Sequence, residues 1–400
     1  EHHARTLQLR WIEIDPNNAW IRRITVRQPD YMLLEQSEHA NWITSRIQAV
    51  RSLSELPLPG QPNNRLALNR LQSILEDNRE SIYVRLAAVE ALRKWQNLHA
   101  PATTTSMSGS WPGLSHLMHF KTHAKWFDAY DNVRPNDFRD VNTYILKLFV
   151  PSAISRTRAL DGCSPDEALH FILELLQNND NTNNPYSDDE YVASLIRALS
   201  SAYCLNKTRI SRIGLEEETK DIAILELRRV LGFYMNIRRS HNRVVEIACL
   251  KALSRLQRAR LLSWNDLTCF AAPFDERGER NDILLRQAAL ACSIELYLDT
   301  RNPKKGWRLA FAWFASLLND KKNVLEASIE ANMWSTLLRM VRRNLTHERS
   351  VDALHDVCSE TRDTVRILWN LMTISVDPMR RVCAYTLYVV GVQAREYKSP

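Results

Sequence analysis

Three histidines share one face of a segment whose apolar pattern predicts a helix. His116, His119 and His123 are spaced i, i+3 and i+7, so successive helical turns would bring their imidazoles together. Imidazole nitrogens bind zinc well, but no cysteine or carboxylate nearby completes a usual ligand set. The alternative to a zinc site is the half-exposed face of an amphipathic helix. We therefore expect no metal ion and no cofactor.

A second group that could bind a ligand is the arginine-rich stretch RRSHNR, which contains Arg238, Arg239 and Arg243. Guanidinium groups bind phosphates and carboxylates in a planar, bidentate geometry. The chain has a formal net charge of +7, and most of its 53 basic residues are arginines. Two interpretations stay open: a contact for DNA phosphates or an acidic partner, and a solvated charged face with intramolecular ion pairs. Any DNA binding should be weak, because +7 over 400 residues is a modest charge.

A third group is the loop NNDNTNNPYSDDEY, which is unusually rich in asparagine. Short amide side chains can satisfy backbone groups where one helical repeat turns onto the next. The loop is therefore either a structural turn or a docking site for a partner. The residues that we single out for this are Asn179, Asp180, Asn181 and Tyr186.

Familiar catalytic motifs are missing from the sequence. A zinc peptidase places two histidines one helical turn apart with a glutamate base after the first. The one His-Glu pair is His347-Glu348, and Val351 stands where the second histidine would be. A Walker loop, a GxGxxG motif and a GxSxG elbow are also absent. We expect that this chain is not an enzyme.

The elements that must position these groups are repeated amphipathic helices. In YVRLAAVEALRKW, Tyr83 to Trp95, apolar residues recur with helical spacing and leave only a narrow polar strip. Such a helix must be covered on two sides. Similar segments recur along the chain, and one polar position marks the same register in each: Arg46, Arg85, Glu246, Arg286 and Arg380. Of these register residues, the first two are 39 residues apart, and the third and fourth are 40 residues apart. A period near 40 predicts an all-α fold, a HEAT/armadillo-like α-solenoid.

Composition supports a large helical core. The chain is 45% hydrophobic with nine glycines, and no apolar run is long enough to span a membrane. Its seven cysteines are scattered without a CxxC pair, which is typical of a reduced intracellular protein. We interpret the tryptophans of the last helices as core residues: Trp307, Trp313, Trp334 and Trp369.

The N-terminal stretch has a different pattern. Leu7 to Ile14 alternates apolar and polar residues, Ile21 to Val26 does so less cleanly, and a turn cluster separates them. We interpret this as a β-hairpin that ends a β-domain lying upstream. The expected organisation is residues 1–36 as this β-domain end and junction, 37–98 as the first repeats, 99–113 as a linker, and 114–400 as the main solenoid. A helix is expected between Pro135 and Pro151.

The stretch LRWIEIDPNNAWIRRITVRQPDYMLLEQSE resembles the junction between β-domain and solenoid in the TFIID subunit 2 family of TBP-associated factors. Zinc aminopeptidases of the same superfamily also end a β-domain in a helical domain. The loop from Asn179 to Tyr191 resembles the TFIID family more closely. The alternative interpretation of this chain is the C-terminal helical domain of an active zinc aminopeptidase. An HExxH motif in the upstream sequence would support that alternative.

The resemblance implies a nuclear, non-catalytic scaffold in transcription initiation by RNA polymerase II. It implies binding to other TFIID subunits, chiefly the tail of TBP-associated factor 8 and part of the largest subunit. It also implies help in recognising core-promoter DNA near the initiator, and an upstream domain that is catalytically degenerate.

Overall fold

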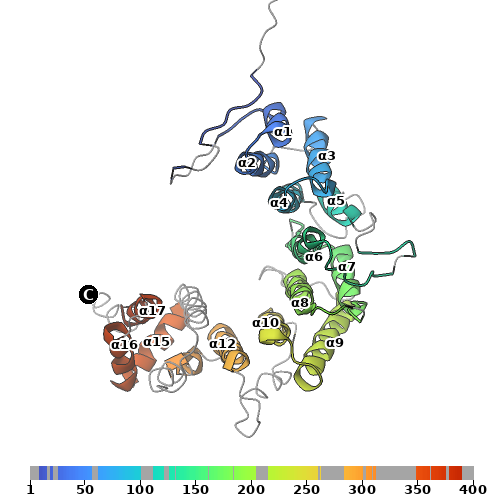
Figure 1. Ribbon diagram of the computed structural model, residues 1–400. Coiled ribbons are helices and arrows are strands. Elements are labelled where there is room, and N and C mark those ends of the chain that lie inside the picture. Colours follow the sequence, from blue (N-terminus) through green and yellow to red (C-terminus); the bar gives the residue numbers. More distant parts are fainter. Residues whose placement is uncertain are drawn as a thin grey trace, which may run out of the picture. The chain divides into compact units, whose positions relative to one another are not determined.

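The computed structural model in Figure 1 describes most of the chain. The described residues are 9–15, 19–20, 26–55, 62–100, 111–120, 126–130, 132–160, 162–182, 184–203, 215–259, 262, 283–300, 303–308, 310–311, 348–360, 362–374 and 378–389. The chain divides into two compact units, Glu1–Ala252 and Leu253–Pro400. Each unit is described by itself.

The first unit is a succession of helices. They are α1 (Asp30–His39), α2 (Ile43–Leu53), α3 (Pro62–Glu76), α4 (Ile82–Leu98), α5 (Pro112–Phe120), α6 (Val141–Ile154), α7 (Asp166–Gln177), α8 (Asp189–Tyr203) and α9 (Leu215–Asn236). A short 3-10 turn, His241–Arg243, leads into α10 (Val244–Arg258), which crosses the boundary between the units. No β-strand occurs among the described residues, where an isolated bridge joins Phe127 and Val133. The predicted all-α fold is confirmed.

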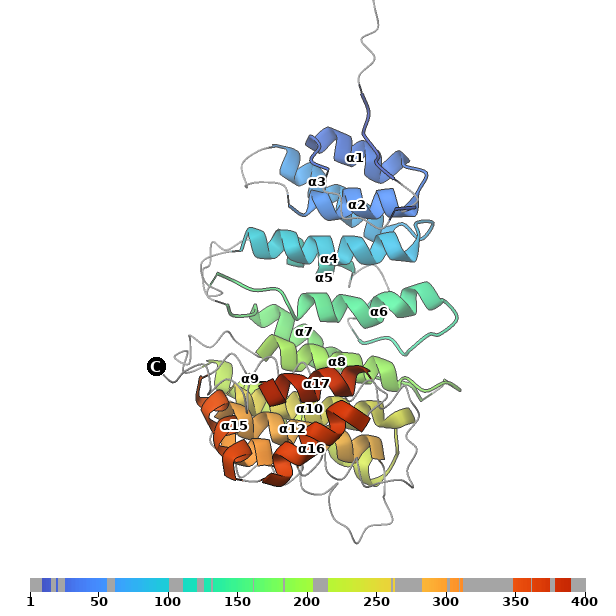
Figure 2. The ribbon, with the colours of Figure 1, turned by 90° about the vertical axis from the view of Figure 1, so that its left-hand side faces the viewer.

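The helices of the first unit form two layers. Helices α2, α4, α6 and α8 pack on one another in succession, while α1, α3 and α7 cover α2, α4 and α8 from the second layer. Figure 2 shows α2, α4, α6 and α8 one below another. This repeated pairing is the arrangement of an α-solenoid, as the periodicity predicts.

Helix α4 shows why the inner layer is so apolar. It packs against α2, α3, α5 and α6. Val84, Ala88 and Leu92 are 0% exposed, and Trp95 is 4% exposed. The small Ala88 lets neighbouring helices approach closely, while the larger side chains fill the space between layers. The expected burial of this helix on two sides is therefore confirmed.

The polar register residues join the inner helices to segments that lie before or after them in the chain. Arg46, in the first turn of α2, forms an ion pair with Glu80, which lies just before α4. Arg85, in the first turn of α4, is 1% exposed, and its Nε donates to the Leu75 carbonyl at 2.9 Å. A polar residue recurs at this position because it can satisfy groups where two elements meet. The side chains of Arg286 and Arg380 lie outside the described residues.

The helix expected between Pro135 and Pro151 has different bounds. Helix α6 begins at Val141, where the Asp140 side chain accepts hydrogen bonds from the first-turn N–H groups of Asn142 and Thr143. It continues through Pro151 to Ile154, so the expected end before Pro151 was wrong. The Ser155 N–H donates to the Pro151 carbonyl at 2.9 Å, which shows that the helix tolerates the proline in its last turn.

The second unit is also helical where it is described. Its helices are α12 (Ile283–Thr300), α15 (Glu348–Glu360), α16 (Arg362–Ile374) and α17 (Pro378–Tyr388), with further helical residues at 303–308 and 310–311. Helix α16 packs on α15 and α17. No helix among the described residues is long and apolar enough to cross a bilayer.

Two of the four tryptophans interpreted as core can be checked. Trp307 is 0% exposed, as expected. Trp369 is 53% exposed, so its assignment to the core was wrong. Among the described side chains of α16, Leu368 and Leu371 are buried, whereas Trp369 is exposed and its ring centroid lies 6.2 Å from that of Tyr388. The other two tryptophans, Trp313 and Trp334, lie outside the described residues.

The N-terminal hairpin stays a prediction. Residues 9–14 are described without a strand, and most of the partner arm lies outside the described residues. The four expected segments with boundaries at 36, 98 and 113 also stay predictions.

Replacing Ala88 with aspartate should lower the free energy of unfolding by about 4 kcal/mol, because the carboxylate would be buried without a partner. Urea denaturation of the chain measures this change. Tyr83→Asp is the control, since Tyr83 lies on the same helix but is 67% exposed. Equal effects of the two substitutions would contradict the placement of α4 in the inner layer.

Candidate functional site

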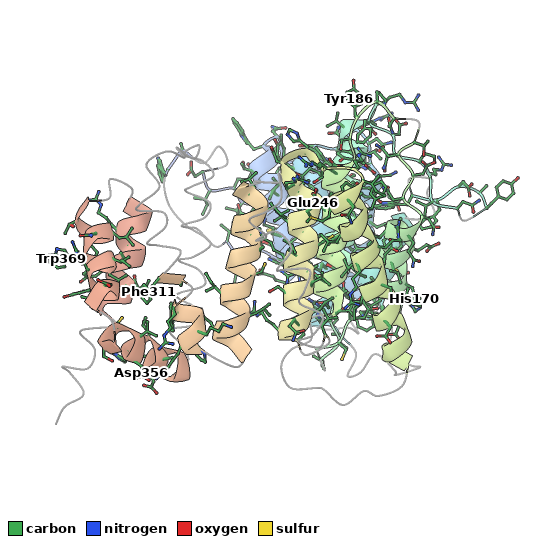
Figure 3. All side chains as sticks on the ribbon, turned by 90° about the horizontal axis from the view of Figure 1, so that it is seen from below. His170, Tyr186, Glu246, Phe311, Asp356 and Trp369 are labelled. Atoms are coloured by element: carbon green, nitrogen blue, oxygen red, sulfur yellow. The ribbon has the colours of Figure 1, made fainter. Side chains whose placement is uncertain are left out.

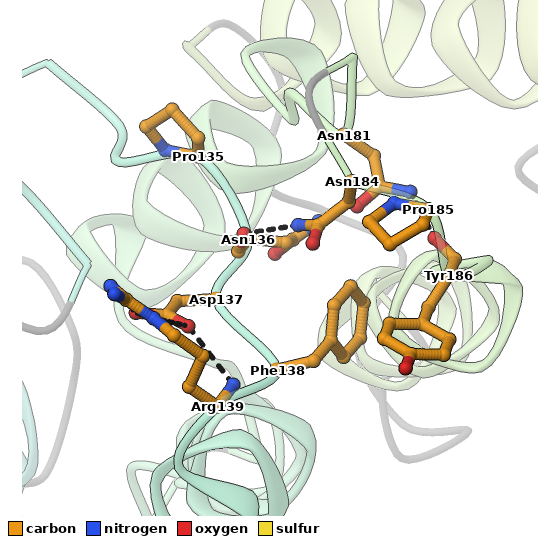
Figure 4. A pocket seen from close by; sticks show the side chains of 9 residues that line it. All are labelled: Pro135, Asn136, Asp137, Phe138, Arg139, Asn181, Asn184, Pro185 and Tyr186. Atoms are coloured by element: carbon orange, nitrogen blue, oxygen red, sulfur yellow. Dashed lines mark hydrogen bonds and ion pairs between the residues drawn. The ribbon is translucent and has the colours of Figure 1, made fainter.

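A cleft of about 640 Å³ lies where the asparagine-rich loop meets the segment before α6 (Figure 4). One wall comes from residues 135–139 and the other from the connection between α7 and α8. Its volume lies within the range of ligand pockets. It is lined by Pro135, Asn136, Asp137, Phe138, Arg139, Asn181, Asn184, Pro185 and Tyr186.

A buried hydrogen-bond network holds the two walls together. The Asn136 side-chain amide donates to Asn179 Oδ1 and to Asp188 Oδ2, both at 3.1 Å. Asn179 Nδ2 donates to the same Asp188 oxygen at 2.6 Å. Asn136 is 7% exposed and Asp188 only 2%. Because hydrogen bonds to a buried carboxylate are strong, Asp188 anchors the loop to the segment before α6.

Backbone groups of the two walls are also satisfied. The Asn136 N–H donates to the Asp180 carbonyl at 3.1 Å, and the Asn184 amide donates to the Asn136 carbonyl. Within the loop, Asn181 Nδ2 donates to the Tyr186 carbonyl at 2.8 Å. These are the roles that short amides take in turns. The cleft is therefore formed before any ligand arrives.

The four loop residues singled out from the sequence have different environments. Asn179 belongs to the buried network. Asp180 accepts hydrogen bonds from the hydroxyl and N–H of Thr182, which lower the pKa of its carboxyl. Asn181 lines the cleft, and its Oδ1 is buried without a hydrogen-bond partner among the described residues. Tyr186 is 66% exposed and lies at one edge of the first unit in Figure 3.

Aromatic rings form one side of the cleft. The Phe138 ring lies 4.8 Å from the Tyr144 ring and 6.0 Å, edge to face, from the Tyr186 ring. Burial, with the nearby Asp188 carboxylate, raises the pKa of Tyr144 to about 12. Tyr144 therefore keeps its proton at neutral pH.

The charges beside the cleft largely compensate one another. Arg139 Nη2 lies 2.7 Å from Asp137 Oδ2, and this contact lowers the pKa of Asp137 to about 2. Lys147 lies on α6 and does not line the cleft. It is 5% exposed, and burial lowers the pKa of its amine to about 8. The rim itself thus carries an ion pair rather than a net charge.

The loop and the arginine-rich turn are brought together by Asp189. This carboxylate is 4% exposed and accepts from the His241 N–H at 2.9 Å and from the Tyr234 hydroxyl at 3.4 Å. Arg238 Nη2 lies 3.8 Å from it. Two groups that are about 50 residues apart in the sequence are therefore neighbours in the first unit.

The arginines of that turn have unequal access to solvent. Arg239 is exposed, whereas Arg243 is 5% exposed and pairs with the fully buried Glu246 at 2.9 Å. Asn242 and Arg243 have φ values of 49° and 56°, so the turn holds two left-handed residues. Ser240 adds a hydroxyl contact to Glu246. Arg243 is therefore buried in an intramolecular ion pair. This position does not fit a contact with DNA or an acidic partner, which was one of the two interpretations of the arginine-rich stretch.

The histidine triplet can be followed only in part. His116 lies half-buried on α5, while the side chain of His119 and all of His123 lie outside the described residues. Among the described residues no group of three or more His, Cys, Asp or Glu side chains could hold a metal ion.

Sequence reasoning missed Asn136 and Phe138, because it assigned them to a helix. The signals that could have found them are Pro135-Asn136-Asp137, which favours a turn, and Asp140, which caps a helix starting at Val141. Asp188 lies in the asparagine-rich loop, but its partner Asn136 is 52 residues away, and no local pattern pairs the two.

Replacing Asp188 with alanine should destabilise the chain by about 3 kcal/mol, because two buried amides would lose their acceptor. Thermal unfolding followed by circular dichroism measures this loss. Asp180→Ala is the matched control, since that carboxylate is exposed and bonds only within its own turn. A loss no larger for Asp188 than for Asp180 would show that the network does not hold the walls.

Comparison with known proteins identifies the family. Residues 30–392 match the family described as "TAF2-like, TPR repeats". TPR repeats have a shorter period, about 34 residues, than the 39 and 40 measured between register residues here. Both repeat types are helix pairs stacked into a solenoid.

Relatives named transcription initiation factor TFIID subunit 2 occur in animals and yeasts. The chain is 28% identical to that of Danio rerio over 372 residues, which is 91% of this chain and 28% of the relative. With Drosophila melanogaster it shares 27% identity over 292 residues, 71% of this chain and 22% of the relative. With Saccharomyces cerevisiae it shares 29% over 186 residues, 46% of this chain and 13% of the relative.

The chain therefore spans less than a third of the length of these relatives. The family match covers most of the chain and favours the TFIID interpretation of the N-terminal and loop motifs. This chain belongs to the TAF2-like family, the family of TFIID subunit 2.

Proposed function

We propose that this chain is a non-catalytic scaffold segment of the general transcription factor TFIID, acting in the nucleus. The observation that carries the proposal is the family match over residues 30–392. The relatives' name, transcription initiation factor TFIID subunit 2, supplies the complex.

Its work in that complex would be to bind other subunits. Stacked helices offer a long surface to which an extended segment can lie across several repeats. We propose the tail of TBP-associated factor 8 as such a segment, with part of the largest subunit as a second partner. Fixing a disordered tail costs conformational entropy for each residue, so its affinity must come from many modest contacts.

A weak contribution to promoter binding near the initiator is the second part of the proposal. Arg238 and Arg239 are its candidate contacts, because both are exposed at one turn. Arg238 already lies near Asp189, which reduces the positive charge available to DNA. Such contacts would be sequence-independent, since phosphates carry no sequence information.

Successive truncation of the TBP-associated factor 8 tail should weaken its binding to this chain in steps. The reason is that a strip-like interface loses a few contacts with each segment removed. Isothermal titration calorimetry measures the affinities, with a tail of scrambled sequence as control. Complete loss on removing one short motif, or no binding of the full tail, would refute the strip-like interface.

Changing Arg238 and Arg239 together to glutamate should reduce the slope of log affinity for duplex DNA against log salt by about 2. Each arginine that contacts a phosphate releases about one counterion. Fluorescence anisotropy at several salt concentrations measures the slope. Arg51→Glu with Arg79→Glu is the charge-matched control, because both arginines are exposed far from the turn in sequence. Equal slopes for the two double variants would place DNA contacts elsewhere.

A further inference from the structure

Three inner helices of the first unit keep apolar side chains in contact with water. Ile43 on α2, Tyr83 on α4 and Phe149 on α6 are 46%, 67% and 51% exposed. On each helix a half-buried apolar residue three or four positions away extends the same side. We call these six residues the apolar band: Ile43, Ile47, Tyr83, Leu86, Ile145 and Phe149.

Cations lie on the same sides of these helices, toward their C-terminal ends. Arg51 comes one turn after Ile47 on α2, and Arg156 comes two turns after Phe149, just beyond the end of α6. Helix α4 contributes two cations to this row, and all of its members except Arg93 are exposed. We call this row the basic band: Arg51, Arg93, Lys94 and Arg156.

A cluster of charges shows that these sides of α4 and α6 meet. One oxygen of Glu90 lies 2.5 Å from Arg93 Nη2, and the other lies 3.3 Å from Arg156 Nη2. Although burial alone would raise the pKa of the Glu90 carboxyl, the bonds and charges of nearby cations, Lys94 among them, lower it below its usual value. Even with Glu90 and the exposed Glu55 counted, the basic band keeps a surplus of positive charge.

The two bands run across successive repeats. Helix α2 packs on α4, and α4 packs on α6. Figure 2 shows the three helices one below another. In α2 and α4 the bands also keep the same register, because Ile47 follows Arg46 as Leu86 follows Arg85. Stacking of equivalent repeats therefore brings the corresponding residues side by side.

The fold itself explains only one of the two bands. The helix dipole favours cations near C-terminal ends, which accounts for part of the basic band. It gives no reason for Tyr83 and Phe149 to stay in water. Contiguous exposed apolar surface beside polar residues is typical of an interaction site. The apolar band therefore indicates a partner.

The arrangement of the bands selects the chemistry of that partner. An extended chain points successive side chains to opposite sides. A segment laid across the helices between the bands would place alternate residues on the apolar band and on the basic band. Axes of packed helices lie about 8–10 Å apart, so a segment of roughly six residues would reach from α2 to α6.

Charge complementarity favours acidic residues on one side of the segment. Carboxylates form strong, charge-assisted hydrogen bonds with arginine and lysine side chains. The phosphates of DNA would also match the basic band, but they would leave the apolar band uncovered. An acidic and apolar peptide satisfies both bands.

We propose that the apolar and basic bands of α2, α4 and α6 bind an extended segment of another protein in which acidic and apolar residues alternate. Its apolar side chains pack on residues such as Phe149, and its carboxylates pair with Arg51 and Lys94. The inference rests on the proposed function for the source of the segment, which is another TFIID subunit.

The first test uses peptides of defined pattern and the whole chain. A blocked, fluorescein-labelled peptide of four Glu-Leu repeats should bind, as measured by fluorescence anisotropy at low salt. The same residues ordered as two repeats of Glu-Glu-Leu-Leu should bind about fivefold more weakly, because fewer side chains can face the matching band. Four Lys-Leu repeats should not bind.

The second test reverses charge in the basic band. Arg51→Glu with Lys94→Glu should weaken binding of the Glu-Leu peptide about tenfold. The same double variant should gain binding of the Lys-Leu peptide, which a folding defect could not produce. Arg79→Glu with Arg239→Glu is the charge-matched control, because both arginines are exposed and lie outside the bands.

The third test removes one side chain of the apolar band. Phe149→Ala should weaken binding of the Glu-Leu peptide about fivefold, because less apolar surface would be buried. Tyr130→Ala is its control, since Tyr130 is 86% exposed and lies outside the bands. A circular dichroism melt shows whether each variant is folded.

The outcomes separate this inference from the proposed function. Equal binding of the two Glu and Leu orders, or an unchanged peptide preference of the charge-reversed variant, would overturn the alternating segment. So would duplex DNA that binds through Arg51 and Lys94 when the Glu-Leu peptide does not, or a dimer of the chain that Phe149→Ala dissociates. The tail of TBP-associated factor 8 could bind elsewhere on the chain in each of these cases, so the scaffold function keeps its own test.

Discussion

The first unit depends on the burial of its inner helices on more than one side. Helix α4 contacts helices before it, after it and in the second layer, and its central residues Val84, Ala88 and Leu92 are fully buried. A helix of this kind cannot be stable alone, because its apolar face would be left in water. Each repeat therefore needs its neighbours, which is why the fold grows as a stack.

Stacking of the helices buries polar groups of the turns away from water. The buried carboxylates of Asp188 and Glu246 accept hydrogen bonds from such groups in neighbouring turns. A buried carboxylate is costly unless it is paired or bonded. Asp188 is bonded by two amides, and Glu246 pairs with Arg243. The same need explains why one of three arginines in a basic cluster faces the interior.

The cleft is a by-product of these turn networks. Its rigid part is structural, since Asn136, Asn179 and Asp188 bond to one another. Tyr186 lies at the exposed edge of this cleft, and its carbonyl accepts a hydrogen bond from Asn181. The structural interpretation of the asparagine-rich loop therefore accounts for Asn179 and Asn181, while the docking interpretation stays a prediction.

The sequence alone was sufficient for the fold class and for the helix at Tyr83 to Trp95. Period and amphipathicity are local properties, so α4 could be predicted from its own residues. The family could also be predicted, from the N-terminal and loop motifs together. Local pattern failed at Pro151 and Trp369, where packing decides whether a helix continues and which face is covered.

Only the tertiary structure decided which polar groups meet. Asn136 joins Asp188 across 52 residues, and Asp189 joins the arginine-rich turn across a similar distance. Arginine has the same chemistry at positions 238 and 243, yet Arg243 is buried against Glu246 and Arg238 is not. The physical reason is that hydrogen bonds and desolvation depend on distances between segments. Those distances are set by how the repeats stack, which no single stretch of sequence contains.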